Sequence, residues 1–472
     1  MVRTQVRFPA GAHNKYCDDY FKWYWKLMDG TNSNQQEPCE KHKRKKRRIE
    51  CDKGVVDRIS ELPDEIIYII LSFLPLRQAA STSLLSHRWP DLWKHTSNLD
   101  FIDSNRRHNI KTTEIENDSW DVSTCKNVKM VNSVLESHQA LFLKEFRIQF
   151  YINSSAQSTI TKWLEFVWSR QVERLNLKFI CDNSPKHMLV LGDLLGEIRC
   201  MQHLKTLSLR CLIISGEDIS LFLKNCPLLR ELNIEGSHLT SEVKFCDSTL
   251  VLEELRIRKC NIRESFINIS APNLALVSVD ARPGQLWFEN VPRLVDVNFA
   301  IYSARYTMQH FTSAVSCITS QLEKLTFSLY LYPKKLSWNG FPIMPNLKEL
   351  VVKESSLYEH GCLLPLKSVI SACPCLQNFK FEFNESSVKN APNVERCPHQ
   401  YIKTMKFQGS CATDIIQSMT YITVCCNAYQ EIKRCTRAMS KDGVHSHREQ
   451  MVHLQQHLSH QVEIKFFKSI DE

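Results

Sequence analysis

The sequence predicts an α/β chain in which a short three-helix domain precedes a long solenoid of parallel strands, closed by a C-terminal α/β cap. Three observations predict this order. Residues 57–101 carry apolar side chains at the spacing of helices. A short apolar pattern then recurs ten times within residues 135–390, whereas residues 391–468 depart from it.

The first helix of the helical domain, residues 57–101, is recognised by the spacing of its apolar residues. Ser60 is the expected N-cap, Pro63 suits the first turn, and Pro75 ends the helix. The apolar residues follow the i, i+4, i+8 spacing of a helix and not the alternation of a strand: Leu62, Ile66, Ile67, Ile70, Leu71 and Leu74.

Two more short helices are expected in the helical domain. One covers residues 77–85, and the next places Trp89 and Trp93 four residues apart on one face. A stretch of about 45 residues lies near the lower size limit for a self-sufficient core. It also holds more large apolar groups than three short helices can cover among themselves. The surplus needs a partner surface, from the same chain or from another protein.

Six short motifs follow one another in the helical domain: Asp57-Arg58-Ile59-Ser60, Leu62-Pro63-Asp64, Leu71-Ser72-Phe73-Leu74-Pro75, Ser81-Thr82-Ser83, Leu85-Ser86 and Arg88-Trp89. In this order they resemble an F-box of the plant type. The resemblance implies docking on a Skp-type adaptor and, through it, on a cullin-RING ubiquitin ligase. It also implies which residues supply that contact or its support: Leu62, Pro63, Ile66, Ile67, Ile70, Leu71, Leu74, Leu84, Leu85 and Trp89.

One residue departs from the F-box pattern. Pro90 follows Trp89 where the family usually has a polar residue with a free amide. A proline there either sits in a first helical turn or shortens the third helix. The alternative interpretation of the whole stretch is an ordinary helical subdomain that is buried against its own chain.

Composition indicates an ordinary soluble protein. The chain has 472 residues, of which 43% are hydrophobic and 24% charged. No apolar run approaches the ~20 residues that a membrane helix needs, and the N-terminus has no apolar signal core. The 19 cysteines are therefore expected to be reduced thiols in a cytosolic or nuclear protein.

Residues 1–53 are expected to form a poorly ordered extension that contains a basic run at residues 41–48. Seven of these eight residues are cationic: Lys41, Lys43, Arg44, Lys45, Lys46, Arg47 and Arg48. The formal net charge of +9 less these seven leaves +2 for the rest of the chain, which argues against a dedicated nucleic-acid binder. The run predicts nuclear import, with the cytoplasm as a second location. A merely solvated linker is the alternative.

The repeat has the form apolar, two variable residues, apolar, one variable residue, apolar. Successive copies start 20 to 32 residues apart, a spacing that matches leucine-rich repeats, whose stacked coils share one core. Chance matches in a leucine-rich α/β domain are the alternative. The copies are Leu143-Phe146-Ile148, Val172-Leu175-Leu177, Leu204-Leu207-Leu209, Leu229-Leu232-Ile234, Leu252-Leu255-Ile257, Leu274-Val277-Val279, Leu294-Val297-Phe299, Leu322-Leu325-Phe327, Leu347-Leu350-Val352 and Leu376-Phe379-Phe381.

Side chains between the inward positions of each strand are expected to point outward. Leu207 and Leu209 would face the core, which leaves the neighbouring positions for a mixed-charge ladder on the concave face. A solenoid of this kind binds large or extended partners across many positions. For any one residue, plain solvation is the alternative to contact with a protein substrate. The candidate substrate-binding residues are Arg210, Glu235, Arg256, Arg258 and Asp280.

Residues 391–468 are similar to the FBD domain that closes many plant F-box/LRR proteins. The similarity rests on Cys397-Pro398-His399, on Gly409 and on a late strand at residues 462–467, with helices expected at residues 414–426 and 448–458. Ser410-Cys411-Ala412 stands where that family has a second glycine. In physical terms the region is expected to cap the last exposed repeat edge.

We find no pattern that predicts catalysis, a metal site or a cofactor. His453 and His457 lie four residues apart on an expected helix, but Leu454 stands where a zinc protease needs glutamate. Twelve glycines leave little room for a phosphate-binding loop. A possible zinc-ligand group lacks the CxxC spacing: Cys373, Cys375, Cys397 and His399. Cys373 has a repeat-equivalent in Cys226, so both are expected to be small core residues.

These expectations combine into a non-catalytic substrate-recognition subunit of an SCF-type (Skp-cullin-F-box) E3 ubiquitin ligase. The helical domain would dock on the adaptor, and the repeats would hold a protein substrate. Proximity to a charged conjugating enzyme would then raise the effective concentration of substrate lysines. The alternative is a leucine-rich-repeat scaffold or nuclear binding protein that acts without a ligase.

Overall fold

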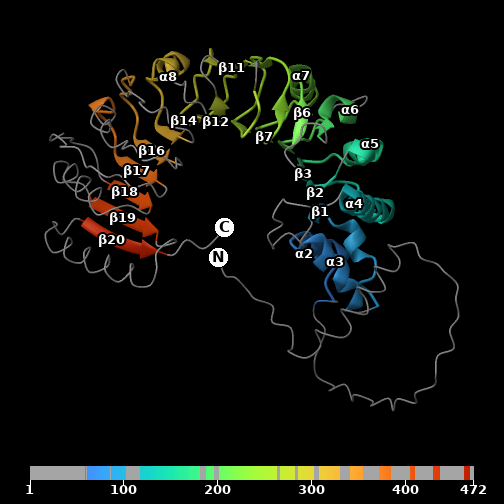
Figure 1. Ribbon diagram of the computed structural model, residues 1–472. Helices are drawn as coiled ribbons and strands as arrows, with labels where there is room; N and C mark the ends of the chain where they lie inside the picture. Colours follow the sequence, from blue (N-terminus) through green and yellow to red (C-terminus); the bar gives the residue numbers. More distant parts are fainter. Residues whose placement is uncertain are drawn as a thin grey trace, which may run out of the picture. The chain divides into compact units, whose positions relative to one another are not determined.

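The structure is a computed structural model of the chain. It describes residues 59, 61–85, 87–102, 117–152, 154–180, 188–195, 201–262, 266–281, 285–301, 308–329, 341–354, 371–383, 404–409, 429–435 and 462–467. They fall into two compact units, residues 1–172 with 179–182, and residues 173–178 with 183–472. In Figure 1 the helical domain is blue and the C-terminal strands are red.

The described part of the helical domain, in the first unit, has four short helical segments: α2 (Asp64–Ser72), α3 (Leu76–Ser81), η1 (Thr82–Leu84) and η2 (Leu92–His95). Pro63 is the N-cap of α2, so the prediction that Ser60 caps this helix is wrong. The second predicted helix divides into α3 and η1. The third is a single 3-10 turn that begins at Leu92, after Trp89. Pro90 shortens it because a proline restricts the preceding backbone and donates no hydrogen bond.

The end of the helical domain is also the first strand of the solenoid. β1 (Asn98–Ile102) runs parallel to β2 (Glu145–Tyr151), with Leu99 opposite Phe146 and Phe101 opposite Ile148. All four side chains are buried. The first unit also contains α4 (Asn117–Ser137), η4 (Ser154–Ala156) and α5 (Gln157–Ser169).

Parallel strands follow one another in chain order, one from each coil, in the second unit, apart from the last two residues of β3. They are β3 (Arg174–Ile180), β5 (Thr206–Arg210), β7 (Glu231–Glu235), β10 (Glu254–Arg258), β12 (Leu276–Ala281), β14 (Asp296–Ile301), β15 (Lys324–Leu329), β16 (Glu349–Glu354), β17 (Asn378–Phe383), β18 (Thr404–Gly409), β19 (Tyr429–Cys435) and β20 (Val462–Phe467).

The pairing register confirms the repeat predicted from the sequence. Leu175 and Leu177 lie opposite Leu207 and Leu209, and the apolar strand positions correspond in the same way through β17. The first apolar residue of all ten copies is buried as well, which places it in the core beneath the strands. This confirms the predicted α/β fold class, in which a small helical domain is followed along the chain by a leucine-rich-repeat solenoid.

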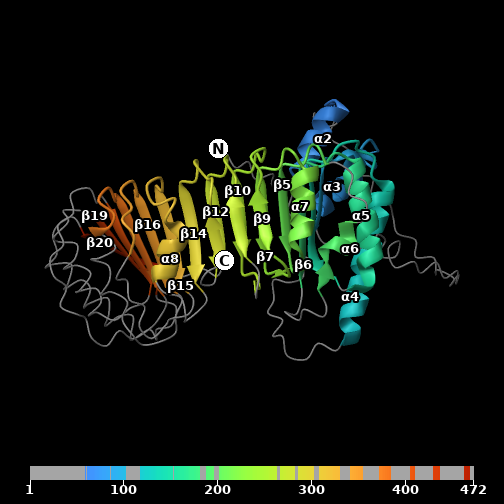
Figure 2. The ribbon, with the colours of Figure 1, turned by 90° about the horizontal axis from the view of Figure 1, so that it is seen from above.

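The return segments of the coils differ along the second unit. Short helices α6 (Leu191–Leu195), α7 (Gly216–Asn225) and α8 (Met308–Val315) serve some coils. Others return through two small parallel sheets on the outer side of the strands (Figures 1 and 2). These sheets are β4 (Leu189–Val190), β6 (Leu212–Ile214) and β8 (His238–Leu239), and β9 (Val243–Cys246), β11 (Ile267–Ser270) and β13 (Leu286–Phe288).

The C-terminal strands continue the sheet of the repeats. β20 has the bounds that the sequence predicts, whereas β18 is a strand that the sequence analysis did not assign. β18 pairs with β17 in the repeat register, with Met405 opposite Phe379 and Phe407 opposite Phe381. The predicted helices at residues 414–426 and 448–458 lie outside the described residues, as do the basic run, Cys397, His399, His453 and His457.

Cys226 and Cys373 are core residues, as their equivalent repeat positions predict. Both thiols are buried, and burial raises the pKa of Cys373 to about 12. Cys373 is therefore a neutral packing group at ordinary pH, and both residues pack as small apolar groups. Among the described residues, no helix combines the length and hydropathy needed to cross a membrane.

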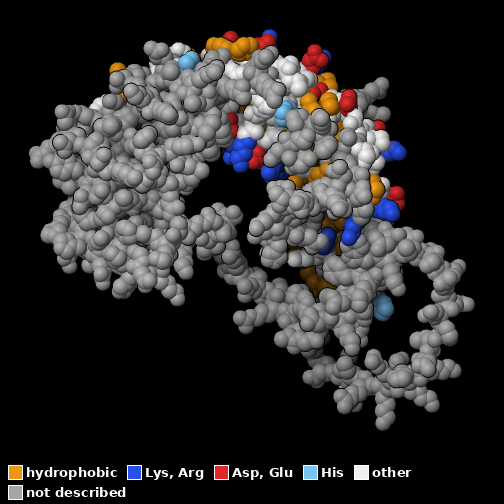
Figure 3. All heavy atoms as spheres, viewed as in Figure 1, with side chains coloured by type: hydrophobic (Ala, Val, Ile, Leu, Met, Phe, Trp, Pro, Cys, Tyr) orange, Lys and Arg blue, Asp and Glu red, His pale blue; other side chains and the backbone are white. Residues whose placement is uncertain are grey.

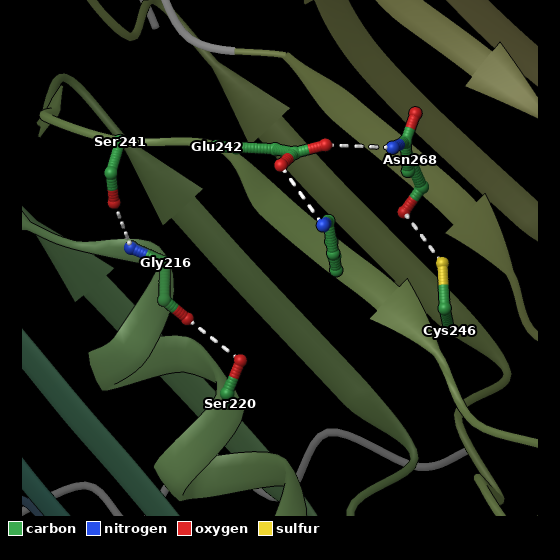
Figure 4. A network of polar contacts seen from close by, with 7 residues as sticks. Gly216, Ser220, Ser241, Glu242, Cys246 and Asn268 are labelled. Carbon is green, nitrogen blue, oxygen red and sulfur yellow. Dashed lines mark hydrogen bonds and ion pairs between the residues drawn. The ribbon is translucent and has the colours of Figure 1, made fainter.

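Two neighbouring coils approach closely where α7 begins (Figure 4). Ser215 caps the helix by accepting the Asp218 N–H, and the N–H of Gly216 donates to Ser241 Oγ at 2.8 Å. A Cβ atom at Gly216 would lie 1.8 Å from the carbonyl oxygen of Glu242. Only glycine fits this contact without a backbone shift.

We expect Gly216→Ala to lower the free energy of unfolding by about 1–3 kcal/mol or more, because two coils must move apart. Gly192→Ala is the comparison: a Cβ there would meet the Asp218 carboxylate at 2.8 Å, a side-chain end in the α7 cap that can shift where the Glu242 backbone cannot, so its loss is expected to be smaller. Urea unfolding of the full chain, followed by circular dichroism, measures both. Equal losses from the two variants would contradict the close-approach argument.

Candidate functional site

The helical domain has a core of its own. Arg88 Nη2 ties it together by donating to the Leu62 carbonyl at 2.6 Å and pairing with Asp64. Leu62 and Leu74 are partly buried against the core cluster. The cluster consists of Ile67, Leu71, Ala79, Trp89 and Leu92.

This core divides the residues that the resemblance assigns to the adaptor contact or its support. Ile67, Leu71 and Trp89 are at most 4% exposed, which leaves them the supporting role. Leu62, Tyr68, Leu74 and Trp93, all of the helical domain, pack against them. Several other large apolar side chains of the domain face outward.

A second set of large apolar side chains faces outward from the same helices. Of the predicted residues, Pro63, Ile66, Ile70, Leu84 and Leu85 are exposed. Ile59, Ile69 and Phe73 are also exposed, Phe73 by 80%, and sequence reasoning missed them. The signal was the run Ile66-Ile67-Tyr68-Ile69-Ile70, which is apolar on every side of the helix. A helix of this kind buries one face and still presents another to a partner.

The helical domain is joined firmly to the first coil. Asn98 Nδ2 donates to the Ser72 carbonyl at 2.7 Å, at the end of α2. The N–H groups of Gln139 and Lys144 donate to the carbonyls of Lys94 and Ser97 at 2.9 and 2.8 Å. Because β1 is shared, deleting the whole domain would also strip the first strand from β2. Point substitutions are the cleaner probe of its surface.

His138 lies buried in this junction. Its Nε2 is 2.9 Å from the Thr96 carbonyl oxygen, and its ring packs edge-on against Phe166. Burial lowers the pKa of His138 below its usual 6.5, while the hydrogen bond to Thr96 acts in the opposite direction. The imidazole is therefore neutral in the folded protein near neutral pH and donates Nε2–H to Thr96.

The predicted substrate-binding residues form a ladder across neighbouring strands. Arg210, Glu235 and Arg258 lie opposite one another on β5, β7 and β10. Arg210 is exposed, Glu235 has Lys259 Nζ at 3.8 Å, and Arg256 is ion-paired with Glu254. Figure 3 shows basic and acidic side chains together on the hollow side of these strands.

Asp280 has a different place from the one predicted. It is buried, and its carboxylate accepts the backbone N–H of Lys259, a residue with a φ of 54°. In the preceding coils the N–H groups of Cys211 and Gly236 donate to a backbone carbonyl of the next coil. The Asp280 side chain replaces that carbonyl and closes the turn. This corrects its assignment to the substrate-facing set.

Charge pairs continue along the ladder beyond the predicted residues. Lys324 Nζ lies 3.7 Å from Asp296 and 3.6 Å from Glu349, on three adjacent strands. Burial raises the pKa of Asp296, and the Lys324 ammonium counteracts the shift. Within the described ranges, no three His, Cys, Asp or Glu side chains gather as a metal site would require. The arrangement is suited to recognising another protein.

Two family models match the chain. The F-box domain model matches residues 59–101, and a model described as At1g61320/AtMIF1, LRR domain, matches residues 195–462. The second match extends over β18 and β19, which agrees with their place in the repeat sheet. The fold and the two matches together define a protein in which an F-box precedes leucine-rich repeats in the sequence.

Several proteins of Arabidopsis thaliana are similar to the chain. The FBD-associated F-box protein At5g60610 is 30% identical over 75% of this chain and 93% of its own length. The putative F-box/FBD/LRR-repeat protein At4g13965 is 27% identical over 72% of this chain and 77% of its own length. The F-box/LRR-repeat protein At1g55660 is 27% identical over 62% and 85%. The chain belongs to the plant F-box/LRR-repeat family.

The buried His138 makes the junction sensitive to acid. The unfolded chain takes up a proton as the pH falls through 6.5, before the folded chain does, so stability is lost from there down to the lower pKa of the folded state. We expect the melting temperature to fall between about pH 7.5 and about pH 5.5, and to fall less in a His138→Gln variant. Equal drops in both proteins would contradict this assignment.

Proposed function

We propose that this chain is the substrate-recognition subunit of an SCF-type E3 ubiquitin ligase. The F-box docks on a Skp-type adaptor, and the repeats bind a protein substrate. One observation carries the proposal: α2 buries Ile67 and Leu71 in the F-box core while Ile66 and Ile70 remain exposed beside other large apolar side chains. Such a patch on a self-packed domain is typical of a surface that binds another protein.

In this function the chain acts without catalysis of its own. The adaptor links it to a cullin-RING assembly, and the repeats hold the substrate near a charged conjugating enzyme. Holding both partners on one assembly raises the effective concentration of substrate lysines. The mixed-charge ladder supports the substrate role, since complementary charges give a protein interface its specificity. Arg210, Glu235, Arg256 and Arg258 are the proposed substrate contacts.

A scaffold that works without a ligase is the second candidate. The observation that favours it is the short third segment of the F-box, where only the 3-10 turn η2 follows Pro90. Loss of a full helix there reduces the area available for an adaptor. In that function the repeats would bind a nuclear or cytoplasmic protein, and the F-box would serve only to cover the first strand.

Adaptor binding by the full chain separates the two candidates. We expect the double variant Ile66→Asp/Ile70→Asp to bind a purified Skp-type adaptor at least ~100-fold more weakly, because two carboxylates would have to be buried unpaired. Titration calorimetry measures the dissociation constants. Leu221→Asp on α7 is the matched control, since this helical leucine is 38% exposed and lies in the second unit.

Each outcome decides between the candidates. A tight wild-type complex that survives Leu221→Asp and is lost in the double variant supports the receptor. Absence of binding by the wild-type chain, or equal binding by all three proteins, would reject the receptor and favour the scaffold.

We also infer that the basic run at residues 41–48 directs the chain to the nucleus. Seven cations in eight residues support an import signal. In plant cells, we expect a fluorescent fusion to lose nuclear accumulation when the seven cations become alanine. Replacing Arg3, Arg7 and Lys15 is the control for a general loss of charge. If the alanine variant is distributed between nucleus and cytoplasm as the wild type is, the basic run is a solvated linker and not an import signal.

A further inference from the structure

Cations gather near the ends of four neighbouring strands of the second unit, within the mixed-charge ladder. Arg210 at the end of β5 lies opposite Lys178 on β3 and Glu235 on β7. Glu235 in turn lies opposite Arg258, the last residue of β10. The row from Lys178 to Arg258 therefore carries three cations and one carboxylate, and Lys259 follows as a fourth cation.

The carboxylate of this row already has a partner, whereas three of the cations do not. Glu235 has Lys259 Nζ at 3.8 Å. Among the described residues, no carboxylate forms an ion pair with Lys178, Arg210 or Arg258. Arg258 is half-buried, and its Nε has no hydrogen-bond acceptor there. Because an anionic acceptor stabilises a half-buried guanidinium, Arg258 is prepared for an anion that another molecule supplies.

The beginnings of three of these strands carry no free cation. β5, β7 and β10 begin with Thr206, Glu231 and Glu254. Arg256, two residues further along β10, is ion-paired with Glu254. The unpaired positive charge is thus concentrated near the strand ends. Asp280 of the next strand is buried and accepts the N–H of Lys259, which gives that carboxylate a structural role.

We propose that the protein substrate presents an acidic segment to these strand ends, where Lys178, Arg210 and Arg258 bind its anionic side chains. The inference rests on the proposed function, since it concerns the substrate that the repeats hold. Neighbouring strands lie about 4.8 Å apart, so the row spans about 14 Å, the length of about four extended residues. Guanidinium groups bind carboxylates and phosphates in a bidentate manner, which suits acidic and phosphorylated side chains alike.

The arrangement favours a protein over a nucleic acid. Glu235 stands between the cations of the row, and Glu231 and Glu254 lie on the same strands. These carboxylates would repel a nucleic acid, whose backbone carries a phosphate at every step. A peptide can place anionic side chains opposite the cations and neutral ones opposite Glu235, so the carboxylates contribute to specificity by excluding the wrong partner.

The test measures binding of two fluorescein-labelled peptides to the full chain by fluorescence anisotropy. One peptide alternates glutamate with glycine and the other phosphoserine with glycine, which distinguishes the two sources of anionic side chains. All proteins carry alanine at the seven cations of the basic run, because that run would itself attract acidic peptides. We expect the dissociation constant of the tighter peptide to rise at least ~10-fold in Arg210→Gln/Arg258→Gln, because two charge-assisted contacts are lost.

The matched control is Arg230→Gln/Arg293→Gln, which removes the same charge from the turns before β7 and β14. Both arginines already have partners, since Arg230 pairs with Glu253 at 3.1 Å and Arg293 Nη1 donates to Asn273 Oδ1 at 3.1 Å. Melting curves verify that all variants are folded. Arg210→Glu provides a second disruption at a fully exposed position.

The outcomes separate this inference from the proposed function. Weaker binding by both Arg210 variants, with the control unchanged, supports the acidic segment. Wild-type affinity in these variants, or an equal loss in the control, overturns it. Failure of both peptides to bind also overturns it, as does tighter binding of an oligothymidylate of the same charge. Adaptor titrations decide the proposed function independently, because none of these substitutions alters the F-box.

Discussion

The parallel pairing of strands in one constant register is the constraint on which the rest of the structure depends. Each coil offers two inward apolar side chains, such as Leu207 and Leu209, and places them opposite their equivalents in the next coil. A slip of one residue would turn them outward and bury charges such as Arg210 instead. Because a single coil cannot bury its leucines, the core exists only through the stack.

The same constraint makes the F-box part of the stack. β1 lies at the end of the F-box sequence and pairs with β2. Phe101 is therefore both one of the last F-box residues and part of the strand that begins the repeat sheet. Hydrogen bonds from Asn98 and Gln139 reinforce the joint. A domain fixed in this way presents its exposed apolar surface at a defined place on the first unit.

Much of the fold could be predicted from the sequence because the repeat is an explicit period. Ten apolar triplets located the strands from β2 to β17, and Pro90 left two alternatives for the third segment, a first-turn position or a shorter helix. The candidate surface was less predictable. Ile66, Ile67, Ile69 and Ile70 are chemically alike, and only packing against Trp89 and Leu92 separates the buried Ile67 from its exposed neighbours. The sequence pattern placed Asp280 in the charge ladder, whereas its carboxylate accepts the backbone N–H of Lys259.

The sequence by itself determined the order of the parts, the period of the coils and the apolar character of the F-box, since each depends on residue type and spacing alone. The tertiary structure decided which face of α2 remains open and which ladder charges are already paired. These features depend on contacts between residues far apart in the chain. Local periodicity carries no record of such contacts, because it reports the face of an element and not what covers that face.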